Sequence, residues 1–101
     1  MNVTIMKLDK KDKEFKAIVK DRDSKKTIHF GQAGASDMTQ HGDESRKMRY
    51  ISRHKKNEDW NKSGIDTAGF YSKHLLWNKD SFEKSFKNLK KKFPTVNFTY
   101  K

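Results

Sequence analysis

The chain has 101 residues, of which 32% are hydrophobic and 37% charged, and its formal net charge is +11. It contains no cysteine, which excludes disulfides, thiol nucleophiles and thiolate zinc sites, and no apolar run approaches the roughly 20 residues of a membrane span. The N-terminus lacks a signal-peptide pattern, so we expect one intracellular domain over residues 1–101.

The first third of the chain predicts a small sheet. Residues 3–8 form a short candidate strand, and residues 14–20 alternate apolar and polar side chains, as a half-buried strand does. A polar segment at 21–25 separates them from a third alternating run at 26–30, which predicts a hairpin with a longer loop. Alternation returns at 96–100, so we expect the chain to end as a further strand of the same sheet.

Three helices are predicted after a glycine-containing loop at 31–42. The first runs over about 43–56 with Asp43 as its N-cap, and the second over about 67–77 with Asp66 or Thr67 as cap and a mostly buried surface. The third begins at Asp80, presents one apolar stripe and ends at Pro94; the stripe is Phe82, Phe86, Leu89 and Phe93. The predicted fold is α+β, with a small antiparallel sheet packed against about three helices.

The first helix carries the most informative charge pattern. Its cations recur at i, i+3, i+7 and i+10 without an acid among them: Arg46, Arg49, Arg53 and Lys56. Met48 and Ile51 would mark the buried side, while Tyr50 and His54 would flank the cations. Guanidinium groups suit phosphate oxygens and an aromatic ring can stack on an exposed base, so this face is a candidate nucleic-acid contact.

A second basic group lies on the last helix and at its end. It consists of Lys84, Lys87, Lys90, Lys91 and Lys92. Lysine is a point charge with little geometric selectivity, so this group would strengthen binding without reading sequence. An ordinary solvated helix surface explains the same lysines equally well.

Other chemistries have weaker signals. A metal-dependent nuclease would need carboxylates and histidines that converge on one ion, and the candidates are Asp37, His41, Asp43, Glu44, His54 and Glu58. Their spacing does not enforce convergence, and helix capping, ion pairing and packing explain them as well. The string Gly31-Gln32-Ala33-Gly34 matches a GXXG motif but follows a strand, where a plain turn accounts for it. Trp60 and Trp77 are predicted core residues, with Trp60 as a possible partner-docking residue.

A family resemblance lies in the middle of the chain. The resemblance rests on the following residues: Phe30-Gly31, Gly34, Asp37, Thr39, His41, Asp43, Arg46-Lys47, Tyr50, Arg53-His54, Glu58, Trp60, Thr67-Ala68-Gly69, Ser72 and Leu76-Trp77. In these residues the stretch resembles a family of small basic proteins encoded by nucleocytoplasmic large DNA viruses of algae and protists. The resemblance implies a viral origin, in an infected cell or a virion, and carries over no catalytic residue.

The charge implies a polyanionic partner, because self-repulsion at +11 opposes a compact state unless something negative is nearby. The leading expectation is a non-enzymatic protein that binds nucleic acid in an infected cell or a virion, with DNA favoured over RNA, without cofactor or metal. A minor capsid or other structural protein that meets an acidic protein surface is the first alternative. The metal-dependent nuclease is the second.

Overall fold

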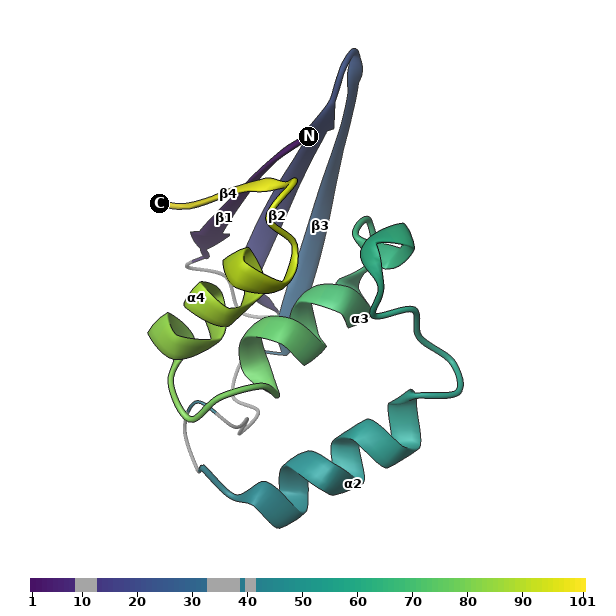
Figure 1. Ribbon diagram of the computed structural model, residues 1–101, viewed down its shortest axis with the longest axis vertical. Coiled ribbons are helices and arrows are strands. Elements are labelled where there is room, and N and C mark those ends of the chain that lie inside the picture. Colours follow the sequence, from purple (N-terminus) through teal and green to yellow (C-terminus); the bar gives the residue numbers. More distant parts are fainter. Residues whose placement is uncertain (9–12, 33–38, 40–41) are drawn as a thin grey trace.

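The computed structural model describes residues 1–8, 13–32, 39 and 42–101, which form a sheet with helices on one face (Figure 1). The strands are β1 (Asn2–Lys7), β2 (Lys13–Asp21), β3 (Ser24–Gln32) and β4 (Asn97–Tyr100). They hydrogen-bond in the order β3-β2-β1-β4. The predicted α+β class is confirmed. In the described ranges no helix has the length and apolar composition that crossing a bilayer requires.

The direction of β4 differs from the prediction. The first three strands form the expected antiparallel meander, with Val3 opposite Val19 and Phe15 opposite Phe30. β4 instead runs parallel to β1, with Phe98 beside Val3, so the sheet is mixed. An alternating pattern specifies which side chains face the core, and it is the same for both strand directions. The direction of β4 was therefore beyond what the pattern could predict.

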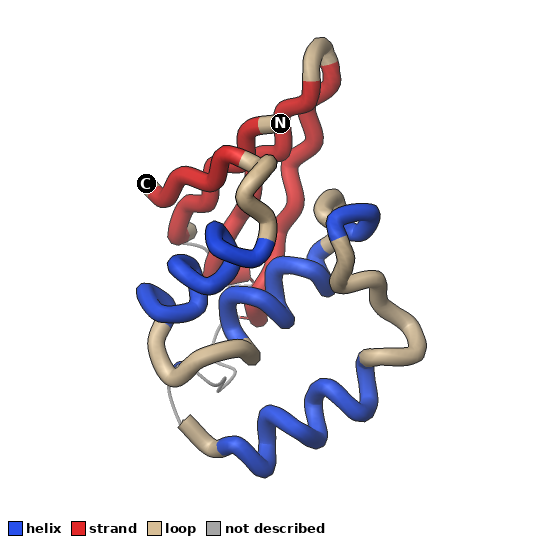
Figure 2. The backbone as a smooth tube through the Cα atoms, viewed as in Figure 1, coloured by secondary structure: helices blue, strands red, loops and turns tan. Residues whose placement is uncertain are grey.

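The hairpin between β2 and β3 is tighter than predicted. Its strands continue to Asp21 and Ser24, which pair with each other across the two residues Arg22 and Asp23. Arg22 takes a positive φ of 57° in this turn. The tip projects beyond the helices (Figure 2), and residues 20–27 are exposed. Polar side chains therefore occupy strand positions here, which explains why the sequence resembled a loop.

The core lies between the sheet and the helices. Alternate strand residues point into it and are almost fully buried: Val3, Ile5, Ala17, Ile28, Phe30 and Phe98. Phe15 stacks on Phe30 at 5.5 Å and on Phe82 at 5.1 Å between ring centroids, and Phe30 lies 5.5 Å from Tyr71. Each large side chain buried in this way contributes roughly 1.5–3 kcal/mol, so few apolar residues suffice for the core.

The helices are α2 (Glu44–His54), α3 (Ala68–Tyr71) and α4 (Phe82–Lys92). A 3₁₀ turn, η1 (Lys62–Gly64), precedes α3, and a π-helical segment, η2 (Ser72–Leu76), continues it. Asp43 caps α2 as predicted, and Thr67, one of the two predicted candidates, caps α3; each side chain accepts backbone N–H from the first turn. At α4 the N-cap is Ser81, and the predicted cap Asp80 pairs instead with Lys84.

The predicted apolar stripe of α4 is confirmed. Leu89 is fully buried, while Phe82, Phe86 and Phe93 are partly buried and pack against the core. The predicted burial of the second helical segment is also confirmed, because Phe70, Tyr71, His74, Leu75 and Leu76 are all buried. Its division into an α-helical and a π-helical turn was not predicted.

Gly64 permits the closest backbone approach in this part of the fold. A Cβ atom at this position would lie 1.9 Å from the carbonyl oxygen of Asp59. A Cβ at Gly69 would instead meet the carboxyl group of Glu58 at 2.7 Å, near the end of a flexible side chain. The two glycines therefore bring the 58–61 segment against η1 and α3 by different means.

We expect Gly64→Ala to destabilise the fold by about 3 kcal/mol or more, because backbone atoms must shift to relieve the clash. Gly69→Ala is the matched comparison and should cost less, since the side chain of Glu58 can rotate away. Urea unfolding followed by circular dichroism measures both. Equal losses for the two variants would contradict this view of the Gly64 contact.

Candidate functional site

Helix α2 is attached to the rest of the protein through Tyr50. The phenol ring stacks on the indole of Trp77, with 4.6 Å between centroids and 6° between planes, and His54 stacks on Tyr50 at 4.3 Å. Tyr50 is 7% exposed, and burial together with the charge of Glu58 raises the pKa of its hydroxyl. The prediction that Tyr50 stacks on a base is therefore wrong, because its ring is already used inside the protein.

The buried side of α2 also differs from the prediction. Met48, expected to face the core, is 60% exposed, and Ile51 is half-buried. The inner side is formed by Tyr50 and His54, which lie about 40° apart around the helix. A planar ring that can stack on Trp77 gains more contact than a flexible methionine, so the aromatic residues set the orientation of α2.

The predicted cations of α2 remain on its outer side. We call the surface of Arg46, Arg49, Arg53 and Lys56 the arginine face, and all four residues are exposed. The ion pairs formed within the described residues involve none of the four. His54 was predicted to flank these cations on the surface, but it is half-buried. Its Nδ1 lies 3.2 Å from Oε2 of Glu58. The arginine face thus keeps its positive charge unpaired within the described part of the chain.

The lysines of α4 are less available than the arginines. Lys84 lies 3.1 Å from Asp80 and Lys87 lies 3.3 Å from Glu83, both as i,i+4 pairs on the surface. The ammonium of Lys90 stands 5.6 Å from the ring centroid of Phe86. Exposed pairs of this kind contribute little stability, but the two carboxylates reduce the local positive charge. Lys91 and Lys92 are exposed at the end of the helix.

Glu58 links the end of α2 to the segment that follows it. Its Oε1 accepts a hydrogen bond from the indole N–H of Trp60 at 3.0 Å, and its Oε2 faces His54. Gly69 leaves the space in which this carboxyl group lies. One carboxylate therefore positions both the aromatic stack on α2 and the indole of Trp60.

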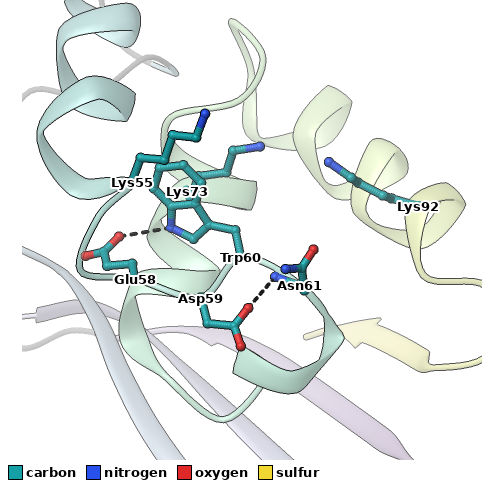
Figure 3. A pocket seen from close by; sticks show the side chains of 7 residues that line it. All are labelled: Lys55, Glu58, Asp59, Trp60, Asn61, Lys73 and Lys92. Atoms are coloured by element: carbon teal, nitrogen blue, oxygen red, sulfur yellow. Dashed lines mark hydrogen bonds between the residues drawn. The ribbon is translucent and has the colours of Figure 1, made fainter.

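Beside this carboxylate lies a cavity of about 530 Å³ with Trp60 in its wall, which we call the tryptophan pocket (Figure 3). Its lining consists of Lys55, Glu58, Asp59, Trp60, Asn61, Lys73 and Lys92. The prediction that Trp60 anchors the core is wrong, because Trp60 lies outside the core cluster, whereas Trp77 packs against it. Trp60 remains partly exposed at the pocket.

Lys73 is the most perturbed cation of the tryptophan pocket. Its ammonium stands 5.6 Å from the ring centroid of Trp60. Burial, together with the smaller effect of the neighbouring charges of Lys92, Lys47 and Lys79, lowers the pKa of Lys73 to about 8. The low pKa follows from several cations gathered around one partly buried amine.

His74 fixes the backbone of Trp60 from the core side. The imidazole is fully buried, and its Nε2 donates a hydrogen bond to the carbonyl oxygen of Trp60 at 2.9 Å. Burial lowers the pKa of His74 to about 4, so the ring is neutral near pH 7. Nδ1 of His74 and the hydroxyl of Tyr71 are buried and find no hydrogen-bond partner among the described residues.

Within the described residues, the candidate metal ligands of the nuclease alternative do not come together. No group of three or more histidine and carboxylate side chains suited to a metal occurs among the described residues. Asp43 caps α2, Glu44 lies in its first turn, and Glu58 faces His54. Asp37 and His41 fall outside the described residues, as do Ala33 and Gly34 of the GXXG string.

Comparison with known proteins gives a family but no function. A model described as a family of unknown function (DUF5754) matches residues 3–54, just over half of the chain. The chain belongs to this family. The region of this chain that matches the family spans β1 to α2, and so includes the arginines of α2. No curated protein and no solved structure matches the chain.

Sequence reasoning missed most of the tryptophan pocket. Lys55, Lys73 and Lys92 are 37 residues apart at the extremes and meet through the fold of the chain. One signal was present, because Lys73 is a charged residue within an otherwise mostly apolar helical segment. A tryptophan surrounded by polar residues at 57–61 was the second signal.

Replacing Tyr50 should release α2. We expect Tyr50→Ala to lower the free energy of unfolding by about 3 kcal/mol, because it removes a buried ring and its stack on Trp77. Tyr50→Phe keeps the ring and should stay within about 1 kcal/mol. Urea titration monitored by tryptophan fluorescence measures both. A Tyr50→Ala protein as stable as the parent would show that α2 does not depend on this contact.

Acid should weaken the fold through His74. The unfolded imidazole takes up a proton near pH 6.5, whereas the folded one does so near pH 4. The unfolded state therefore binds more protons in that window, and stability falls as the pH is lowered, by up to about 3 kcal/mol.

His74→Gln is the matched control, because its amide can still donate to Trp60 but does not titrate. Urea unfolding measured from pH 7 to pH 4 should give a shallower pH dependence for this variant. An unchanged slope would exclude His74 as the source.

Proposed function

We propose that this protein is a non-enzymatic nucleic-acid-binding protein that contacts the phosphate backbone with the arginine face of α2. The observation that carries the proposal is the row of exposed arginines on one helix, unpaired with any described carboxylate. Planar guanidinium groups bind phosphate oxygens in bidentate fashion, and the net charge of +11 supplies long-range attraction. Such contacts position a nucleic acid without reading its sequence.

The shape of this part of the molecule favours DNA over RNA. α2 lies at the lower edge of the molecule in Figure 1, and its four cations are exposed. The major groove of B-form DNA is wide enough for an α-helix, whereas the deep and narrow major groove of A-form RNA is not. The resemblance to small basic viral proteins makes packaged viral DNA a natural partner to test. An acidic protein surface is the competing partner, and charge alone does not distinguish it.

Binding to a duplex of about 20 base pairs should depend steeply on salt. With about six phosphate contacts, affinity should fall about a thousandfold between 50 and 200 mM salt. Fluorescence anisotropy of a labelled duplex measures this dependence, with heparin and an acidic protein as comparison ligands. A flat response to salt would contradict phosphate binding, and a preference for the acidic protein would favour the structural alternative.

A pair of charge-matched variants tests the site itself. The first replaces Arg46, Arg49 and Arg53 by alanine, and the second replaces Lys84, Lys87 and Lys91. Both remove three positive charges from exposed helix surfaces. The arginine variant should lower the salt slope by about three, roughly one for each lost contact, and the lysine variant should lower it less. Equal losses would mean that the chain acts as a general polycation without a defined face.

A further inference from the structure

The tryptophan pocket draws its cations from separate parts of the fold. Lys55 follows the last turn of α2, Lys73 lies in η2 and Lys92 is the last residue of α4. Figure 3 shows the three lysines that line the pocket together with Trp60, Lys92 among them projecting from α4. The ammonium of Lys73 stands over the indole ring. Lys55 lies between Arg53 and Lys56 of the arginine face in the sequence, so the pocket adjoins the C-terminal end of that face.

The carboxylates of the pocket are committed to other partners. Glu58 binds Trp60 and His54, as described above. Asp59 accepts the backbone N–H of Asn61 at 2.9 Å and the hydroxyl of Ser63. None of the ion pairs within the described residues involves Lys55, Lys73 or Lys92. The lysines of the pocket therefore retain charge that a bound anion would stabilise.

The π-helical turn arranges both sides of Trp60. Lys73 and His74 are consecutive residues of η2, yet the first stands over the indole ring and the second binds the backbone carbonyl of Trp60 from within the core. Short π-helical segments occur frequently at functional sites, because the widened turn redirects neighbouring side chains. Here the turn fixes an aromatic wall next to a partly buried cation.

We propose that the tryptophan pocket binds one nucleotide unit of a single-stranded nucleic acid, with its base against Trp60 and its phosphate among the three lysines. The inference deepens the proposed function and rests on it. A cavity of about 530 Å³ falls within the usual range of roughly 300–1,000 Å³ for small-ligand sites. Proteins that hold single strands combine a basic groove with aromatic stacking platforms. An acidic peptide or sulfate would use the lysines but not the aromatic wall.

Fluorescence titration of the full chain with the oligonucleotide dT12 tests the stacking. A thymine base that stacks on Trp60 should quench the tryptophan emission, and the quenching should disappear in Trp60→Phe, which leaves Trp77 as the remaining tryptophan. Trp60→Ala should weaken dT12 binding by about 5- to 100-fold, the usual effect of removing one stacked base. Inorganic phosphate is the control ligand and should not quench. Undiminished quenching in Trp60→Phe, or equal quenching by phosphate, would overturn the proposal.

Variants of the lysines separate this site from the arginine face. Lys92→Gln alters an exposed side chain, so it tests the pocket without risk to folding, and Lys73→Gln tests its partly buried cation. Each should weaken dT12 binding several-fold while duplex binding changes less than twofold, with Lys84→Gln as a matched control that affects neither selectively. One outcome would overturn the proposed nucleotide site and leave the proposed function standing. In it, duplex binding depends on salt, but dT12 binding is unchanged by Lys92→Gln, Lys73→Gln and Trp60→Ala. Failure to bind either nucleic acid would overturn both.

Discussion

The placement of α2 depends on the stack between Tyr50 and Trp77. The two rings are nearly parallel, and His54 extends the stack along the same side of the helix. Because the inner side of α2 is narrow and centred on aromatic rings, most of the remaining circumference is left to solvent, including Met48. The outward direction of the arginine face is therefore a consequence of an aromatic contact on the opposite side of the helix and not of the cations themselves.

Glu58 carries this arrangement onward to the tryptophan pocket. It accepts a hydrogen bond from the indole of Trp60 while its other oxygen faces His54, so the aromatic stack and the pocket wall share one carboxylate. His74 holds the same segment through the carbonyl of Trp60. A neutral, buried imidazole suits this role, because a charged ring at that depth would lack compensation. The two candidate binding surfaces are thus parts of one connected structure.

Charge is distributed unevenly between these surfaces and the rest of the protein. At the start of α4, Asp80 and Glu83 lie four residues before Lys84 and Lys87 and pair with them. The arginine face and the pocket lysines have no such partners among the described residues. Burial, and to a smaller extent repulsion by neighbouring lysines, lowers the pKa of Lys73 to about 8. The cations of the arginine face and of the pocket repel one another in the folded protein, and a bound polyanion would relieve this repulsion.

The sequence by itself determined the α+β class, the meander, the cap at Asp43, the apolar stripe of α4 and the exposed row of arginines, because each depends on local periodicity or on neighbours within one turn. Tertiary structure decided the parallel direction of β4, the burial of Tyr50 and the position of Trp60. These features arise from contacts between segments distant in the chain. An alternating or helical pattern shows that a side chain turns away from solvent, but not which distant ring or cation it meets.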